Sequence, residues 1–270
     1  MVDWNTSGQI SIYQNLSILV YCIVMSAATG LVFGSFLNCG AARTVKGESF
    51  LRGRSTCPAC SHTLGAADLV PLLSWAFLRG RCRYCGAKIS VRYPITELAF
   101  SLLTVLCLLR FDLTVLCLRN WVFLCCLFYL TLTDLDSFLI PDGCLLAAAA
   151  AWFLALAADF PGWRETCLHI LAALAYGGGT LALSLAMDHI LEKETLGGGD
   201  IKLLAVCGLY LGLVGGMFTI LFSCVLGLAF GVLTGQGRGK PFPFGPAISA
   251  ATVGMLFWGG GLIKWYVGLL

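Results

Sequence analysis

Long apolar runs separated by short polar breaks dominate the chain and predict a bundle of membrane-spanning helices. A helix needs about 20 apolar residues to cross the hydrocarbon core of a bilayer, and most of the runs approach that length. We count eight runs, although the two that flank Gly215 and Gly216 also fit one merged or re-entrant element. The expected spans lie near residues 16–38, 96–110, 118–134, 143–159, 167–187, 201–214, 217–234 and 245–266.

The composition agrees with a membrane protein. Hydrophobic residues make up 59% of the 270 residues and charged residues 11%, whereas soluble domains are about half apolar and about a quarter charged. Membrane lipid is therefore the expected environment of most of the chain. The net charge of +3 is too small to favour nucleic-acid binding. No basic residue precedes Arg43, so the first run lacks the basic start of a cleavable signal peptide and should remain as a helix.

The one long polar segment, residues 39–95, separates the first span from the second and is rich in Lys and Arg. Basic loops of this kind lie on the cytoplasmic side of a membrane. The breaks near 134–142 and 188–200 then face the cytoplasm as well. We expect three parts: residues 1–38 with a periplasmic N-terminus and the first helix, the cytoplasmic loop 39–95, and the remaining transmembrane bundle 96–270.

Four cysteines in this loop have the spacing of a metal site. Cys57 and Cys60 form one C-x-x-C pair, and Cys82 and Cys85 form another after 21 intervening residues. Such pairs are typical of structural zinc sites with four thiolates, which leave no open position for catalysis. The metal would supply folding energy that a loop with few large apolar side chains lacks. A redox dithiol and two disulfides are the alternatives, and a cytoplasmic location disfavours both.

Two aspartates stand at the expected cytoplasmic ends of apolar runs. Asp134 closes one run, and Asp200 precedes another. A carboxylate at membrane depth is costly unless it faces protein or water, which favours a functional role. Two such groups brought together can share one proton, so that the ionised member activates water and the protonated member polarises a carbonyl. This is the chemistry of aspartic proteases. The alternative is a helix-capping role, which we favour for Asp136 and Asp142.

Three successive glycines, Gly197, Gly198 and Gly199, lead into Asp200. Glycine runs are unfavourable in helices, and irregular backbone at membrane depth is tolerated only beside water or inside protein. The run therefore predicts a place where an extended substrate backbone lies close to Asp200. Lys202 is expected to pair with one of the two carboxylates or to extend to the membrane interface.

Two other classes of protein share parts of this pattern. Transporters also place carboxylates beside broken helices, but their sites lie near the bilayer midplane rather than at the ends of spans. A membrane thiol oxidoreductase would use the C-x-x-C pairs for redox chemistry.

Taken together, the motifs resemble those of bacterial type IV prepilin peptidases, which belong to the GxGD class of intramembrane aspartic proteases. The resemblance extends over nearly the whole chain. It rests on Gly34-Ser-Phe-Leu-Asn38, the two C-x-x-C pairs, Pro71-Leu-Leu-Ser-Trp75, Arg79-Gly-Arg-Cys-Arg-Tyr-Cys-Gly86, Arg92-Tyr-Pro-Ile-Thr-Glu97, Asp134 with Ile140-Pro141-Asp142, and Gly197-Gly-Gly-Asp-Ile-Lys202.

The resemblance implies that Asp134 and Asp200 are the catalytic pair of an enzyme in the bacterial inner membrane, with its active site facing the cytoplasm. The implied substrate is a type IV prepilin or pseudopilin, in which a short basic leader ends in glycine, the cut follows that glycine, and an apolar helix begins beyond it. The resemblance also implies methylation of the new N-terminus with S-adenosylmethionine, for which Asn38 and Glu97 are the candidate residues.

The segment before the glycines is acidic, which suits a basic leader. Asp188, Glu192 and Glu194 stand there with Lys193 as the one cation. Opposite charges would draw the leader to this place while the apolar helix behind it lies among the spans. The alternative is that these are ordinary solvated charges at headgroup level.

Overall fold

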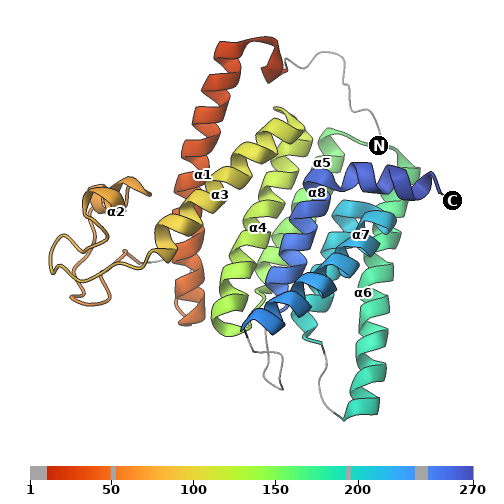
Figure 1. The fold of residues 1–270 in the computed structure, drawn as a ribbon. Coiled ribbons are helices and arrows are strands. Elements are labelled where there is room, and N and C mark those ends of the chain that lie inside the picture. Colours follow the sequence, from red (N-terminus) through yellow and green to blue (C-terminus); the bar gives the residue numbers. More distant parts are fainter. Residues whose placement is uncertain (1–10, 50–52, 193–195, 235–242, 270) are drawn as a thin grey trace. The chain divides into compact units, whose positions relative to one another are not determined.

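The computed structural model describes residues 11–49, 53–192, 196–234 and 243–269 and is almost entirely helical (Figure 1). Within these residues β-strands are absent, and two isolated bridges, Thr56 with Thr63 and Arg81 with Lys88, are the extended pairings. The helices are η1 (Ile12–Gln14), α1 (Leu16–Val45), η2 (Ala66–Asp68), α2 (Leu73–Phe77), α3 (Arg92–Phe111), α4 (Val115–Ser137), α5 (Asp142–Ala158), α6 (Trp163–Leu191), α7 (Gly198–Thr234) and α8 (Gly245–Val267).

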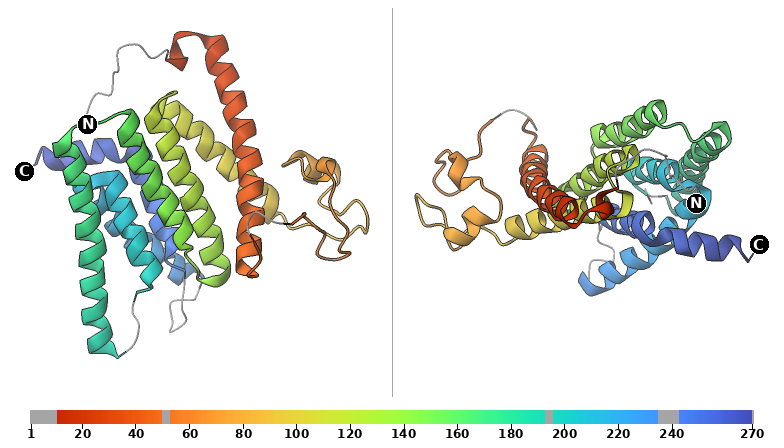
Figure 2. Two further views of the ribbon diagram at one scale, coloured as in Figure 1. Left: turned by 180° about the vertical axis from the view of Figure 1, so that it is seen from behind. Right: turned by 90° about the horizontal axis from the view of Figure 1, so that it is seen from above.

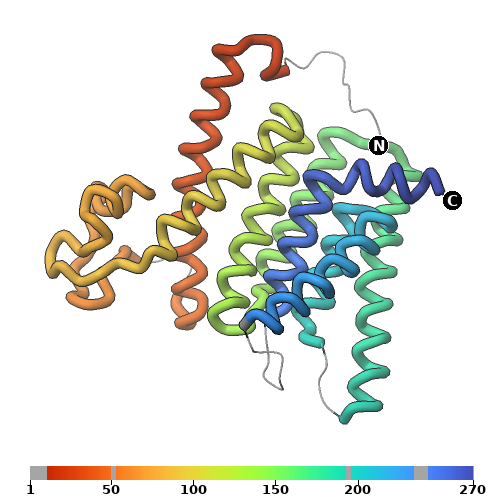
Figure 3. Tube along the Cα trace, in the orientation of Figure 1, coloured from red at the N-terminus to blue at the C-terminus, as the bar shows by residue number. Residues whose placement is uncertain are grey.

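The expectation of an all-α chain of membrane-spanning helices is confirmed. Among the described residues six helices are long and apolar enough to cross a bilayer, namely α1, α3, α4, α6, α7 and α8, and α5 is a shorter apolar helix. The two runs expected at 201–214 and 217–234 both lie in α7, which has one non-helical residue at Gly212. The sequence predicted this break at Gly215 and Gly216, whereas in the structure it lies a few residues earlier, at Gly212. Figure 3 shows the sharp bend within α7.

The chain divides into two compact units, which we describe separately. One contains residues 6–121 and the other residues 122–270.

In the first unit α1 and α3 pack against each other through two glycines. Figure 2 shows these helices crossing, and the lack of a side chain at Gly30 and Gly34 allows the close approach. A Cβ atom at Gly30 would lie 2.5 Å from the Cα of Ser101, and one at Gly34 would lie 3.1 Å from the Cα of Glu97. Ser101 Oγ also donates a hydrogen bond of 2.9 Å to the Ala27 carbonyl. Small residues and interhelical hydrogen bonds of this kind hold helices together where lipid removes the hydrophobic drive.

In the second unit a buried aromatic pair joins α4 to α7. Phe123 and Tyr210 stack with ring centroids 3.9 Å apart, and the Tyr210 hydroxyl donates to the Ala148 carbonyl of α5 at 2.8 Å. The buried core around this pair also contains Leu127, Leu130, Trp152, Leu203, Leu204, Cys207 and Ile248. The core thus fixes the relative positions of α4, α5 and α7, which carry the acidic residues described below.

The break in α7 has partners on α6. Gly212 has a φ of 67°, which glycine adopts without strain. His169 Nδ1 lies 2.8 Å from the Leu209 carbonyl oxygen before the break, and the Tyr176 hydroxyl donates to the Leu213 carbonyl after it. Backbone groups freed from a helix at membrane depth need such partners, because lipid offers none.

We predict that Gly30→Ala lowers the thermal midpoint of the detergent-solubilised protein. The added methyl group would collide with the backbone of α3, and overpacking of this kind costs about 1–3 kcal/mol. Gly254→Ala in α8 is the control, because no atom lies within 4 Å of its Cβ position and alanine favours the helix. Equal midpoints for the two variants would contradict the packing argument.

Candidate functional site

Asp134 lies in the last turn of α4, buried with 4% of its surface exposed. The Gly245 backbone N–H, at the start of α8, donates a hydrogen bond of 2.9 Å to its Oδ2. The contact requires glycine, since a Cβ atom at this position would lie 2.7 Å from the same oxygen. The first N–H groups of a helix have no partner within it and carry a partial positive charge, so they stabilise an acidic group placed against them. The start of α8 thus fixes the Asp134 carboxyl group.

Asp200 lies in the first turn of α7 and is brought close to Asp134. The two carboxyl groups are near enough for their charges to interact. Ile140, in the link between α4 and α5, connects their surroundings: its side chain lies 2.8 Å from the Cβ position of Gly199 and 3.4 Å from that of Gly245. Two acids that are 66 positions apart in the chain (200 − 134) therefore lie near each other at helix ends of one unit.

Asp200 Oδ1 is buried and, within the part of the chain that the structure describes, has no hydrogen-bond partner. A buried carboxylate oxygen in this state is costly unless water or a ligand reaches it. The site therefore offers one acceptor that the protein itself leaves open.

The glycine run begins α7 rather than forming an irregular segment, which corrects the expectation for two of its three members. Gly198 and Gly199 are helical, and the Asp200 N–H donates to the Gly197 carbonyl at 3.0 Å. Ile140 covers the Cβ side of Gly199, whereas no atom lies within 4 Å of the Cβ position of Gly198. Open backbone surface at the run is thus found at Gly198.

Lys202 does not pair with either carboxylate of this acidic site. Its Nζ lies 2.8 Å from Asp142 Oδ1, and both side chains are more than half exposed. An exposed pair of this kind contributes little to stability. Asp142 itself is the first residue of α5, after Pro141 as N-cap, as its expected role at a helix start requires.

The four loop cysteines converge on one point. Their sulfur atoms all lie within 4.8 Å of one another, and Cys57 Sγ is 3.9 Å from Cys85 Sγ. A tetrahedral zinc with bonds of about 2.3 Å has sulfur atoms about 3.8 Å apart, so the four positions fit this metal. Backbone N–H groups of Cys60 and Ala59 lower the pKa of Cys57 to about 7. Metal binding uses the thiolate form, which this environment favours at Cys57, whereas burial and the neighbouring thiols raise the pKa of Cys85 to about 11.

The two C-x-x-C turns repeat the same backbone design. The Cys57 N–H donates to the His62 carbonyl, and the Cys82 N–H donates to the Ala87 carbonyl, in each case five residues ahead. The fourth residue after each first cysteine has positive φ: Ser61 at 57° and Gly86 at 71°. The two turns are 25 positions apart. In the sequence only the cysteines reveal this repeat, because the other residues of the two turns differ.

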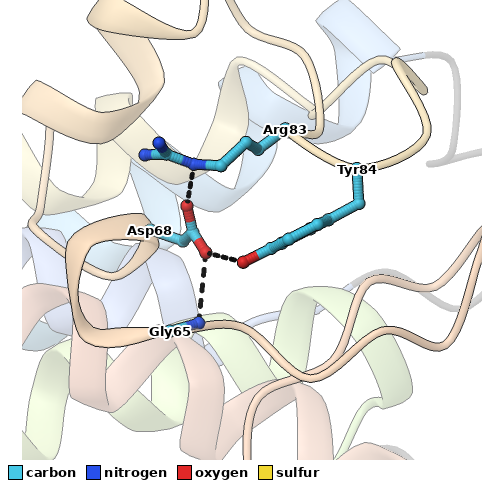
Figure 4. Close-up of polar contacts among 4 residues, drawn as sticks. All are labelled: Gly65, Asp68, Arg83 and Tyr84. Atoms are coloured by element: carbon cyan, nitrogen blue, oxygen red, sulfur yellow. Dashed lines mark hydrogen bonds and ion pairs between the residues drawn. The ribbon is translucent and has the colours of Figure 1, made fainter.

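Asp68 joins the two turns of the loop (Figure 4). Its carboxylate accepts from Arg83 Nε at 2.7 Å, the Tyr84 hydroxyl at 3.0 Å and the Gly65 N–H at 3.1 Å. The Arg83 guanidinium and the other two donors hold the pKa of Asp68 below its usual range. Asp68 thus braces the second C-x-x-C turn against the segment that follows the first.

Asn38 and Glu97, the candidate cofactor residues, are both buried, with 5% and 6% of their surfaces exposed. Glu97 Oε2 accepts the Leu72 N–H at 2.7 Å, and Asn38 Nδ2 has no hydrogen-bond partner among the described residues. Leu72 is the centre of a tight turn with a φ of 61°, closed by a 2.6 Å bond from Leu73 N to the Pro71 carbonyl. Turns of this type are rare and strained, and strain is concentrated at functional sites.

Comparisons with known proteins show the family to which the chain belongs. Residues 28–111 match the model of the bacterial peptidase A24 N-terminal domain, and residues 121–232 match that of the type IV leader peptidase family. A prepilin leader peptidase/N-methyltransferase of Bacillus subtilis (strain 168) is 33% identical over 254 residues, covering 88% of this chain and 95% of the relative. This chain belongs to the type IV leader peptidase family.

Further relatives of the leader peptidase family support this membership. A prepilin leader peptidase/N-methyltransferase of Aeromonas hydrophila is 36% identical, with 79% of this chain and 74% of the relative covered. A type 4 prepilin-like proteins leader peptide-processing enzyme of Escherichia coli O78:H11 is 31% identical, with 87% and 93% covered. No solved structure matches the chain. The leader peptidase match contains Asp134 and Asp200, and the N-terminal match contains the four cysteines.

Sequence reasoning missed two partners in these sites. The first is Gly245, which donates to Asp134. In the sequence it is a glycine followed by Pro246 at the start of a span, a pattern that predicts a helix start but no contact with a carboxylate. Asp68 stands out in the sequence only as one of the few acids of a basic loop, and its donors become adjacent only when the loop folds.

We predict that the purified protein contains about one zinc ion per chain, the number that one four-thiolate site holds. Cys57→Ser and Cys82→Ser should each remove most of the metal and lower the yield of folded protein. Cys224→Ser, an exposed cysteine of α7, is the matched control and should retain the metal. Elemental analysis of equal amounts of protein makes the comparison. A stable, metal-free wild type would show that the cysteine cluster is not a zinc site.

Proposed function

We propose that Asp134 and Asp200 are the catalytic pair of an intramembrane aspartic endopeptidase that removes the basic leader of type IV prepilins or pseudopilins. The observation that carries the proposal is that two carboxyl groups from α4 and α7 lie near each other at helix ends, on either side of Ile140, with one buried oxygen of Asp200 left without a partner among the described residues. Membership of the leader peptidase family supports the choice of substrate.

The roles of the two acids follow from their surroundings. Asp134 already accepts the Gly245 N–H on one oxygen, which favours the ionised form of that group, so we assign it as the base that takes a proton from water. Asp200 then holds a proton and donates it to the scissile carbonyl oxygen. Water adds to the carbonyl carbon as Asp134 takes its proton. When the C–N bond breaks, the released amine takes that proton from Asp134, and a hydroxyl of the tetrahedral intermediate returns a proton to Asp200.

The substrate backbone would approach at Gly198, where the surface of α7 carries no side chain. The leader would lie toward Asp188 and Glu192 at the end of α6, and Lys193 and Glu194 of this acidic segment fall outside the described residues. Opposite charge favours the basic leader there. We place this site at the cytoplasmic face of the bacterial inner membrane, because the basic loop 39–95 belongs on that side.

A transporter is the rival class, and the positions of the acids disfavour it. Asp134 is three residues from the end of α4, and Asp200 is in the first turn of α7. Ion sites in transporters lie near the bilayer midplane, away from the ends of spans. A thiol oxidoreductase is disfavoured by the four-sulfur geometry, which suits a tetrahedral metal.

We predict that Asp134→Asn and Asp200→Asn each lower the cleavage of a co-expressed prepilin by at least about 10³-fold, because neither acid alone can both activate water and polarise the carbonyl. Asp159→Asn, at the end of α5, is the control and should cleave normally. The leader-bearing and mature forms are separated by mass. Full cleavage by Asp134→Asn or by Asp200→Asn would show that the substituted residue is not a member of the catalytic pair.

We also propose that the buried residues Asn38 and Glu97 serve N-methylation of the mature N-terminus. S-adenosylmethionine, when bound, would supply an electrophilic methyl group. The buried Glu97 carboxylate is suited to hold a cationic amino group, and the Asn38 amide, unpartnered within the described part of the chain, is suited to donate to a carboxylate or hydroxyl oxygen. The strained turn at Leu72 is kept in place by Glu97, so the carboxylate is already oriented in the folded loop.

For methylation we predict a separation of the two activities. Glu97→Gln should lower N-methylation of the processed substrate by about 10-fold or more, since it removes the carboxylate that would hold a cationic amino group, while cleavage at the aspartate pair continues. Thr96→Ser, a partly buried neighbour on α3, is the control. Mass analysis of the mature N-terminus reads both reactions. Equal loss of cleavage and methylation in Glu97→Gln would instead indicate a structural role.

A further inference from the structure

The turn between α3 and α4 is tightly organised by its own side chains. The Thr114 hydroxyl donates to the Phe111 carbonyl at 2.7 Å and accepts the Cys117 N–H at 3.1 Å. Asp112 accepts the Leu113 N–H at 2.7 Å and the Ser11 hydroxyl at 2.6 Å. The ends of the two helices are thus held in one arrangement, and the side chains facing each other across the turn have defined positions.

Cys107 and Cys117 face each other across this turn. Their sulfur atoms lie 4.0 Å apart, and each sulfur also approaches the carbonyl oxygen of the other residue, Cys107 Sγ at 3.6 Å and Cys117 Sγ at 3.7 Å. These reciprocal contacts show that both side chains point toward the opposite helix. A disulfide bond is about 2.05 Å long, so rotation of the side chains by a modest angle brings the sulfur atoms to bonding distance.

We propose that Cys107 and Cys117 form a disulfide bond that closes the α3–α4 turn. Cys107 is fully buried and Cys117 is partly exposed, so an external reagent meets Cys117 first. The Cys117 thiolate attacks the disulfide of a thiol–disulfide oxidant, which releases one reduced thiol. Cys107 then attacks the Cys117 sulfur and releases the second. Two protein thiols are oxidised by two electrons, and the oxidant's disulfide becomes two thiols.

The position of the pair in the chain agrees with oxidation outside the cytoplasm. Cys117 lies in the first turn of α4, whereas Asp134 lies in the last turn of the same membrane-spanning helix. The two residues are therefore at opposite ends of this helix. If Asp134 is at the cytoplasmic face, as the proposed function has it, Cys117 is at the periplasmic face. Disulfides persist in the periplasm and not in the cytoplasm, so oxidation of this pair in the cell rests on the proposed function.

A second cysteine pair offers an internal comparison. Cys126 of α4 belongs to the buried core of the second unit, and Cys144 of α5 packs against that core. Cys126 lies between Cys117 and Asp134 on α4, and Cys144 lies in the first turn of α5, beyond Asp134, so neither is at the end of α4 that carries Cys117. This pair is expected to remain reduced.

The test is mass analysis of the full chain from cells quenched with acid and alkylated in denaturant. We expect the peptides with Cys107 and Cys117 to be linked and lighter by two hydrogens, and Cys126 and Cys144 to be alkylated. Cys117→Ser should remove the link, whereas Cys125→Ser, a partly buried neighbour on the same helix, should leave it intact. Purified wild type treated with glutathione disulfide should give the same link, and dithiothreitol should lower its thermal midpoint.

Alkylation of both Cys107 and Cys117 in quenched cells would overturn the proposal, as would a link from Cys117 to some other cysteine. The result is independent of the proteolytic assignment. A protein that cleaves without Asp134 but carries the linked peptides would refute the catalytic pair alone, and a protein that needs both aspartates but has both thiols alkylated would refute the disulfide alone.

Discussion

The contact on which this structure most depends is the hydrogen bond from the Gly245 backbone to Asp134. A buried carboxylate at the end of a membrane-spanning helix has lost much of its hydration and needs other hydrogen-bond donors. A backbone N–H at the start of another helix can donate at little cost, because it has no partner within its own helix. The bond joins α4 to the start of α8, and the Ile140 side chain occupies the space between Gly245 and Gly199. The position of the Asp134 carboxyl group, the stabilisation of its charge and the close packing around it therefore depend on the same contacts. A side chain at Gly245 or Gly199 would disturb them.

The cysteine loop is stabilised by a different principle. Much of its apolar surface is open, including Leu73 and Phe77, so hydrophobic burial contributes little to its shape. Short polar links hold it instead: the turn at each C-x-x-C pair, the Asp68 carboxylate with its three donors, and the Glu97 bond to Leu72. A metal on the four sulfur atoms would join the two turns where no apolar core does.

Sequence patterns predicted the helices and identified the candidate site residues. They did not predict the contacts between distant segments. The apolar runs indicated the spans because a bilayer imposes one length on every crossing helix. The four cysteines were recognisable because metal ligands repeat at fixed spacing. The environments of Gly245 and Lys202 were not predictable, since Lys202 pairs with Asp142 among several nearby acids only after α5 and α7 have packed. The glycine run was misjudged for a related reason: packing against Ile140 stabilises a helix start that intrinsic propensity disfavours.

The bend in α7 also sets a limit on how this membrane protein can be assembled. As a straight rod, its 37 residues would extend about 55 Å at 1.5 Å per residue, nearly twice the roughly 30 Å thickness of the hydrocarbon core. The side chains that contact the carbonyl oxygens at the bend, His169 and Tyr176, both come from the preceding helix. A nascent α7 without α6 beside it would leave the carbonyl groups at its bend without these partners in the bilayer, so we expect α7 to settle there only after α6.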